Sequence, residues 1–199
     1  ENVPVQDSAK LIEEANEKGA RIVGPASVGI IKVGEAKIGS IGSEERMYTK
    51  GNVAIISKSG GMCGETALLL SQNKIGQSTC IGIGGDQILG TSFTDMFEIL
   101  EKDEDTKVIV MYGEIGGKYE ELAAKMIKDG KVSKPVVAFI SGQFAESVGR
   151  ELAMGHAGAI LERGSGNAHE KKKILKDAGA LIANYHDEIP DLVKQALGE

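Results

Sequence analysis

Residues 52–73, NVAIISKSGGMCGETALLLSQN, contain the pattern that determines the fold. The stretch opens with an apolar, β-branched segment at residues 52–56, which is typical of a strand buried on both faces of a parallel sheet. A turn of small residues, SKSGG at residues 57–61, comes next and is followed by a helical stretch at residues 62–73. The order of strand, turn and helix predicts the first unit of a βαβ fold.

The same order recurs along the chain. Further strands are predicted at residues 78–83, 108–112, 136–140 and 180–183, and helices at residues 93–101, 119–128, 168–177 and 189–197. Apolar residues recur at three- and four-residue spacing in these helical stretches, so each has one face that can pack against a sheet. Alternating strands and helices favour a parallel sheet with right-handed crossovers. We therefore predict an α/β fold, a flavodoxin-like doubly wound parallel sheet, over residues 49–199.

The first 48 residues fit this sheet less well. Asp7 or Ser8 is the expected N-cap of a helix over residues 9–18 that stops at Gly19, and ARIVG at residues 20–24 is the expected strand after it. A single αβ unit cannot bury both of its faces. Residues 1–48 are therefore interpreted as the last unit of a Rossmann-like domain, with a connecting loop, whose other strands lie outside this chain.

Composition restricts the class of protein. The 199 residues are 41% hydrophobic and 26% charged, which is typical of a globular chain with a core. No apolar run approaches the roughly 20 residues of a membrane span, and the first residues lack a secretory signal, so a cytoplasmic location is expected. The net charge of −6 disfavours nucleic acid and anionic membranes as partners. The 27 glycines are close to twice the usual share of about 7%, and they gather after the predicted strands.

The turn at residues 57–61 is a candidate anion site. The backbone N–H groups and the dipole at the start of a helix favour a negative charge, and glycine lets a phosphate approach closely. A βα turn whose small residues serve packing alone is the alternative. The turn is not a Walker A loop, because G-x-x-x-x-G-K-[ST] does not occur in the chain.

His156 and Glu114 are the candidate reactive pair. His156 lies in GHAGA among small residues, which leave an imidazole accessible, and a neutral imidazole is a nucleophile toward phosphorus. Glu114 lies in GEIGG at a strand end, where a carboxylate can accept the Nδ1–H of a histidine and leave Nε2 free. An ordinary loop histidine and a structural carboxylate are the alternatives. Asp86, in GIGGD, is a further acidic group at this edge, with helix capping as its alternative role.

The remaining polar residues give weaker signals. His169 and His186 have no motif around them, and the lysines at residues 171–173 are interpreted as a solvated helix face. Cys63 is interpreted as a packed small residue and Cys80 as a strand core residue. Three scattered histidines and two cysteines do not make a metal ligand set, so no metal site is expected.

Four motifs in order, SKSGG-M-x-x-E, G-x4-I-G-I-G-G-D, GEIGG and GHAGA, resemble the α subunit of succinyl-CoA synthetase and the corresponding part of ATP-citrate lyase. The resemblance implies that His156 is phosphorylated. It also implies that Ser59, Gly60 and Gly61 hold the phosphate at the start of a helix and that Glu114 orients the histidine.

The resemblance has consequences for the rest of the chain. GPASVG at residues 24–29 looks like the link between a CoA-binding domain and the flavodoxin-like CoA-ligase domain. The residues that the resemblance places near the substrate or CoA are Pro25, Ala26, Ser27 and Gly155. Most of the CoA-binding domain is missing, so the chain resembles the C-terminal portion of a longer polypeptide that does not bind CoA tightly alone.

The implied function is part of an ATP- or GTP-dependent acid-CoA ligase. CoA and the nucleotide would be substrates, and an ATP-grasp β-type subunit or domain would hold the nucleotide with Mg²⁺ in a hetero-oligomer. The acid is left open. Residues 24–29, the loop at residues 145–154 and residues 130–137 resemble the citrate-using branch, whereas residues 75–86 resemble the succinate branch. The alternative functions are a non-catalytic flavodoxin-like binding or regulatory module and a flavin protein.

Overall fold

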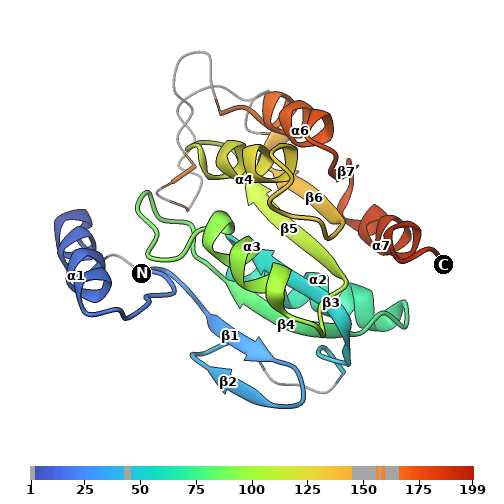
Figure 1. Ribbon diagram of the computed structural model, residues 1–199, viewed down its shortest axis with the longest axis horizontal. Coiled ribbons are helices and arrows are strands. Elements are labelled where there is room, and N and C mark those ends of the chain that lie inside the picture. The colour runs from blue at the N-terminus through green and yellow to red at the C-terminus, as the bar shows by residue number, and fades with distance from the viewer. Residues whose placement is uncertain (1–2, 43–45, 145–155, 157, 160–165) are drawn as a thin grey trace.

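The computed structural model describes residues 3–42, 46–144, 156, 158–159 and 166–199, and it places their strands in one sheet (Figure 1). The elements in chain order are α1 (Val5–Glu17), β1 (Gly29–Lys32), β2 (Ala36–Ile38), β3 (Lys50–Ser57), α2 (Gly60–Gln72), β4 (Gln77–Gly82), α3 (Phe93–Lys102), β5 (Val108–Glu114), α4 (Tyr119–Lys128), β6 (Val136–Ser141), α6 (Ala168–Asp177), β7 (Leu181–Ala183), a 3₁₀ turn η1 (His186–Glu188) and α7 (Ile189–Leu197).

The strand order is β2-β1-β4-β3-β5-β6-β7, and the five strands from β4 to β7 run parallel. Numbered among themselves along the chain, these five strands have the order 2-1-3-4-5, which is that of flavodoxin-like sheets. The predicted fold class is therefore confirmed. Its helices α4, α6 and α7 have the predicted bounds.

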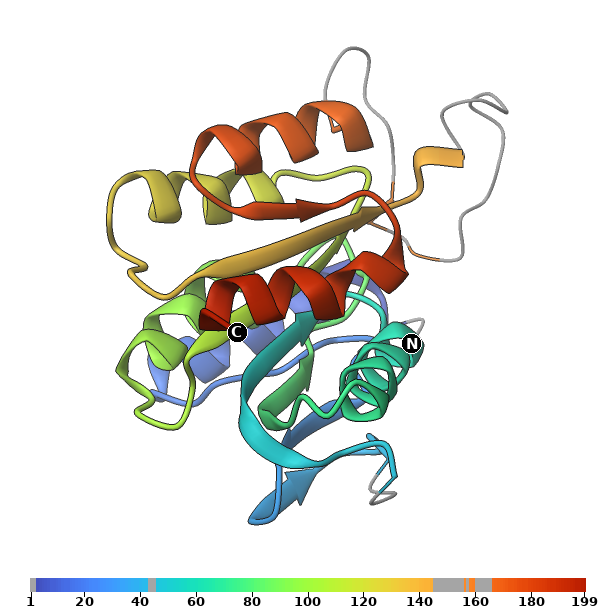
Figure 2. The ribbon, with the colours of Figure 1, turned by 90° about the vertical axis from the view of Figure 1, so that its right-hand side faces the viewer.

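Helices cover both faces of the sheet. On one face α3 contacts α4 and α4 contacts α6, whereas α2 contacts α7 on the other (Figures 1 and 2). Strand β3 shows why both faces are apolar, because side chains alternate along a strand. Ala54 and Ile56 join the core under α3 and α4, and Val53 and Ile55 join the core under α2 and α7.

The two connections after β3 place the next two strands on opposite sides of it. Helix α2 leads from β3 to β4 on one side of it, and α3 then leads back past β3 to β5 on its other side. Ligands of open α/β sheets bind at such a switch point, beyond the carboxyl ends of the strands. In Figure 1 the arrowheads of β3 and β5 point toward the side of the molecule where α1 lies.

The N-terminal part differs from the prediction. ARIVG is not a strand, because the carbonyl oxygens of Ile22 and Gly24 accept hydrogen bonds from the loop after β4 instead of a neighbouring strand. The strands of this part are β1 and β2, and β1 pairs antiparallel with β4. The hairpin before residue 48 is thus part of the same sheet. The division of the chain into domains at that residue stays a prediction.

Helix α1 also starts earlier than expected. Its N-cap is Pro4, which makes no side-chain cap, so neither Asp7 nor Ser8 has the predicted capping role. Ser8 is instead buried in the structure. None of the described helices is both long and apolar enough to cross a membrane.

Candidate functional site

The turn after β3 is fixed by its own serines. The Ser57 hydroxyl donates to the Ser59 carbonyl oxygen at 2.7 Å and accepts from the Ser59 amide at 3.1 Å. Ser59 is the N-cap of α2 and accepts from the Met62 amide at 3.4 Å. The amides of Gly60 and Gly61 lie in the first turn, where a helix offers no carbonyl acceptor. The turn therefore presents backbone donors at the positive end of a helix dipole.

Glycine is needed in this turn because another segment packs on it. A Cβ at Gly60 would lie 2.2 Å from Cγ1 of Val28, and a Cβ at Gly82, at the end of β4, would lie 2.6 Å from Cγ2 of the same residue. Val28 thus fills the space next to two strand ends. It comes from residues 24–29, which the family resemblance predicts to link the CoA-binding and CoA-ligase domains.

His156 and Glu114 are brought together by the fold. His156 Nδ1 lies 2.6 Å from Glu114 Oε2 at the carboxyl end of β5. The Glu114 side chain is 8% exposed and that of His156 is 33% exposed, so the pair joins a buried carboxylate to an accessible imidazole. A carboxylate only accepts hydrogen bonds, so Nδ1 is the nitrogen that donates in this contact, and in a neutral imidazole of that tautomer the lone pair lies on Nε2.

The loop after β4 supports the imidazole. A Cβ at Gly85 would lie 2.4 Å from Cγ and Nδ1 of His156. The Gly158 amide donates to the Gly85 carbonyl oxygen at 2.9 Å, which ties the GHAGA segment to this loop. The second motif, GIGGD, therefore contributes a bare backbone surface on which the histidine ring lies.

A cavity of about 300 Å³ joins these parts. Its described lining residues are Val3, Val5, Ser8, Ala26, Val28, Ser59, Gly60, Gly61, Gly85, Asp86, Gln87, Ile88 and His156. The N-terminus of α2 and the imidazole thus face one space. Asp86 is the carboxylate in this lining, and α1 closes part of its wall.

The segment GPASVG lies next to the same site. Ala26 has a φ of +54° and lines the cavity. The Ser27 hydroxyl donates to the Gly82 carbonyl oxygen and accepts from the Gly29 amide at 2.9 Å. A Cβ at Gly84 would meet the Pro25 carbonyl oxygen at 2.2 Å. Gly155 and the loop at residues 145–154 lie outside the described residues. The roles of Pro25, Ala26, Ser27 and Gly155 near a substrate stay predictions.

Two lysines near the site, Lys58 and Lys171, are buried. From the sequence, Lys171 is interpreted as solvated and no burial is predicted for Lys58. Lys58 lies in the turn at residues 57–61, and its side chain is 1% exposed. Its Nζ lies 3.3 Å from Glu114 Oε1 and 3.5 Å from Glu120 Oε1. Lys171 is fully buried and lies 2.5 Å from Glu120 Oε2. The interpretation of residues 171–173 as a solvated face is thus wrong for Lys171. The helical period places Lys171 with Ala168 and Leu175 on the inner face of α6, whereas Lys173 is exposed.

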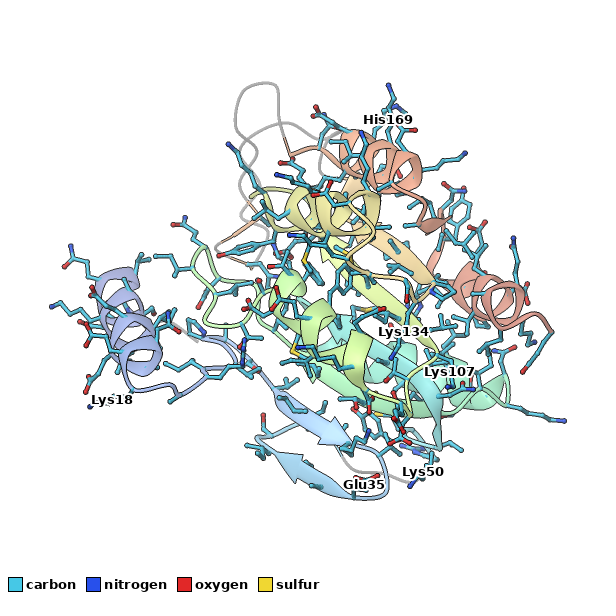
Figure 3. All side chains as sticks on the ribbon, in the orientation of Figure 1. Lys18, Glu35, Lys50, Lys107, Lys134 and His169 are labelled. Atoms are coloured by element: carbon cyan, nitrogen blue, oxygen red, sulfur yellow. The ribbon has the colours of Figure 1, made fainter. Side chains whose placement is uncertain are left out.

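The two cysteines and His169 are not among the described residues that line the cavity. Cys63 and Cys80 are fully buried, and burial raises the pKa of the Cys63 thiol to about 12 and that of Cys80 well above its usual value. His169 lies on the outer side of α6 (Figure 3). Within the described ranges, no group of three or more His, Cys, Asp and Glu side chains could hold a metal ion.

His186 has a structural contact that predicts a pH effect. Its Nε2 lies 2.9 Å from Thr66 Oγ1, and burial lowers the pKa of the imidazole. Below the ordinary pKa of about 6.5 the unfolded state binds more protons, so stability falls as the pH is lowered through this range. Between about pH 7 and about pH 5, urea unfolding should show a larger loss of stability for the wild type than for His186→Gln. Equal losses would contradict this.

Comparison with known proteins places the chain in a family. The CoA-ligase family model matches residues 56–181. The α subunit of ADP-forming succinate–CoA ligase from Methanothermobacter thermautotrophicus is 42% identical over 198 residues, which are 100% of this chain and 65% of that protein. The subunit of the same name from Staphylococcus epidermidis is 43% identical over 189 residues, 95% of this chain and 61% of that protein. The chain thus spans less than two thirds of the length of these relatives.

Solved structures agree with the sequence relatives. ATP citrate lyase from Methanothrix soehngenii, in complex with citrate and coenzyme A, is 30% identical with a TM-score of 0.93 and covers 100% of this chain and 33% of its own. A dinucleotide-forming acetyl-coenzyme A synthetase from Ca. Korarchaeum cryptofilum shares the fold at 23% identity, with a TM-score of 0.77 over 96% of this chain and 39% of its own. With the match over residues 56–181, the chain belongs to the CoA-ligase family.

Proposed function

We propose that this chain is part of an ATP-dependent acid-CoA ligase that forms an acyl-CoA through a phosphohistidine at His156 and an acyl phosphate. One observation carries the proposal. The imidazole that lines the cavity with the N-terminus of α2 has its Nδ1 2.6 Å from the Glu114 carboxylate. This arrangement leaves Nε2 as the nucleophile and sets anion donors in the same space.

The first step moves a phosphoryl group to the histidine. The lone pair of His156 Nε2 forms a bond to the γ-phosphorus of ATP as the bond to the bridging oxygen breaks, and ADP leaves with that electron pair. The ring gains positive charge while Nδ1–H stays bonded to Glu114, so the carboxylate stabilises the product. The amides of Gly60 and Gly61 face the transferring charge as preorganised donors.

The following steps transfer the phosphoryl group and then the acyl group. A carboxylate oxygen of the acid attacks phosphorus, the N–P bond breaks with its electron pair returning to Nε2, and an acyl phosphate forms. The CoA thiolate then attacks the acyl carbon and inorganic phosphate leaves. Neutral His156 is regenerated for the next cycle.

The acid, the nucleotide and the partners belong to the same proposal. Succinate is favoured by the names of relatives at 42% and 43% identity, and citrate is the second candidate because of the ATP citrate lyase match. The ADP-forming names favour ATP over GTP. We propose that an ATP-grasp β-type subunit or domain holds the nucleotide and Mg²⁺, and that a CoA-binding domain completes the hetero-oligomer.

The test is a substrate panel with the complete assembly. The chain, an ATP-grasp partner and the CoA-binding domain are incubated with ATP, CoA and one of succinate, citrate, acetate or malate, and acyl-CoA is measured by chromatography. We expect succinyl-CoA, or failing that citryl-CoA, and no product when the ATP-grasp partner is omitted. Turnover of acetate alone would overturn both acids, and no product with any acid would favour the non-catalytic module.

A further inference from the structure

Four buried charged side chains lie behind the reactive histidine. Lys58 follows β3, Glu114 ends β5, Glu120 belongs to α4 and Lys171 to α6. Each is at most 8% exposed by its side chain. Two positive and two negative charges make the group neutral, which limits the cost of removing these charges from water. We call these four residues the buried quartet.

Glu120 and Lys171 hold the backbone of Glu114. The Glu114 amide donates to Glu120 Oε1 at 3.2 Å, and the Glu114 carbonyl oxygen accepts from Lys171 Nζ at 3.0 Å. Lys171 also donates to the Gly116 carbonyl oxygen, and Glu120 and Lys171 are paired at 2.5 Å. The backbone at the end of β5 is therefore held on both sides by one buried ion pair.

The side chain of Glu114 is held by the other lysine. Its Oε1 lies 3.3 Å from Lys58 Nζ, at an angle that does not make a hydrogen bond, and no other described group bonds to this oxygen. The Lys58 ammonium also lies 5.4 Å from the centre of the Tyr119 ring. This attraction holds Oε1 on the side of Lys58, and the other carboxylate oxygen, Oε2, faces His156 Nδ1 at 2.6 Å.

We propose that Lys58, Glu120 and Lys171 are positioning residues that hold the Glu114 carboxylate aimed at Nδ1, so that phosphorylation of His156 occurs at Nε2 alone. The inference rests on the proposed phosphohistidine and names the residues that restrict the reaction to Nε2. A free imidazole offers two nitrogens, and the fixed carboxylate removes one of them by keeping a proton on it. Loosening the end of β5 frees Nδ1 to react.

Phosphoramidate, a small phosphoryl donor, tests this without a partner subunit. The N–P bond forms at the imidazole as the P–N bond of phosphoramidate breaks, and ammonia leaves with that electron pair. The full chain is treated with the reagent, and ³¹P NMR distinguishes phosphate on Nε2 from phosphate on Nδ1 of His156. The wild type should give the Nε2 product alone.

The informative variants remove the ion pair that fixes the backbone. Lys171→Met should give both isomers, with the rate at Nε2 reduced about 10- to 100-fold because the carboxylate is displaced. The double variant Glu120→Gln/Lys171→Met leaves no unpaired charge from this pair and guards against misfolding. We expect the same mixture of isomers from it. Lys173→Met, the same substitution on the exposed side of α6, should behave as the wild type.

The isomer ratio separates positioning from stability. The inference would be overturned if the folded double variant Glu120→Gln/Lys171→Met gave the Nε2 product alone at the wild-type rate. A wild type that gives both isomers would also overturn it. A failed substrate panel would instead count against the ligase function, because phosphoramidate labelling needs no CoA, acid or partner. The two proposals can thus fail independently.

Discussion

His156→Asn is expected to abolish transfer of phosphate from ATP to this chain in the complete assembly. Asparagine keeps a polar side chain of similar length, but its amide nitrogen has no available lone pair for attack on phosphorus. The wild type should acquire a label from γ-³²P-ATP that is lost in acid and stable in base, as expected for a phosphohistidine. The variant should show no such label, and acyl-CoA formation should stop with it.

The control for this experiment is His169→Asn, which changes a histidine on the exposed side of α6. Its labelling should equal that of the wild type. An undiminished label on His156→Asn would remove His156 from the proposed role.

Gly85→Ala is expected to reduce the labelling rate about 100-fold, because displacement of a reacting group by about 1 Å can cost this much. The new Cβ would lie 2.4 Å from the imidazole, so the ring must leave its place beside Glu114. The imidazole is partly exposed and can move outward without disturbing the core. The thermal unfolding midpoint should therefore change little while the rate of label incorporation falls.

Gly42→Ala is the matched control. The Cβ it adds would meet Tyr48 at 3.8 Å, which is an ordinary contact, and Gly42 does not line the cavity. This variant should label at the wild-type rate. A wild-type rate for Gly85→Ala would show that the ring position seen beside Glu114 is not needed for phosphorylation.

The flavodoxin-like part of the fold could be predicted because its signals are local. The β-branched runs of β3, β5 and β6 and the periodic apolar residues of α4, α6 and α7 specify each element without reference to distant residues. The N-terminal part lacks such signals. An apolar run such as ARIVG fits a strand, but its carbonyl groups bond to the loop after β4, and local sequence does not reveal that competitor.

The candidate site divides in the same way. Strand-end motifs predicted Ser59, Gly60 and Glu114, because parallel strands bring their carboxyl ends to one edge. His156 was predicted from the small residues around it in GHAGA. Lys171 was missed because it lies in a run of three lysines, and its partner Glu120 is 51 residues away on another helix. Its one signal was weak. Position 171 shares the inner face of α6 with Ala168 and Leu175.

Val28 has a mechanical consequence. Its two methyl groups occupy the space that a side chain at Gly60 and at Gly82 would need. One residue is thus wedged between the start of α2 and the end of β4. A displacement of residues 24–29 in either direction would push against one of these backbones or release it. A molecule that binds to residues 24–29 could therefore shift the amides at the start of α2 through Val28, without contacting those amides.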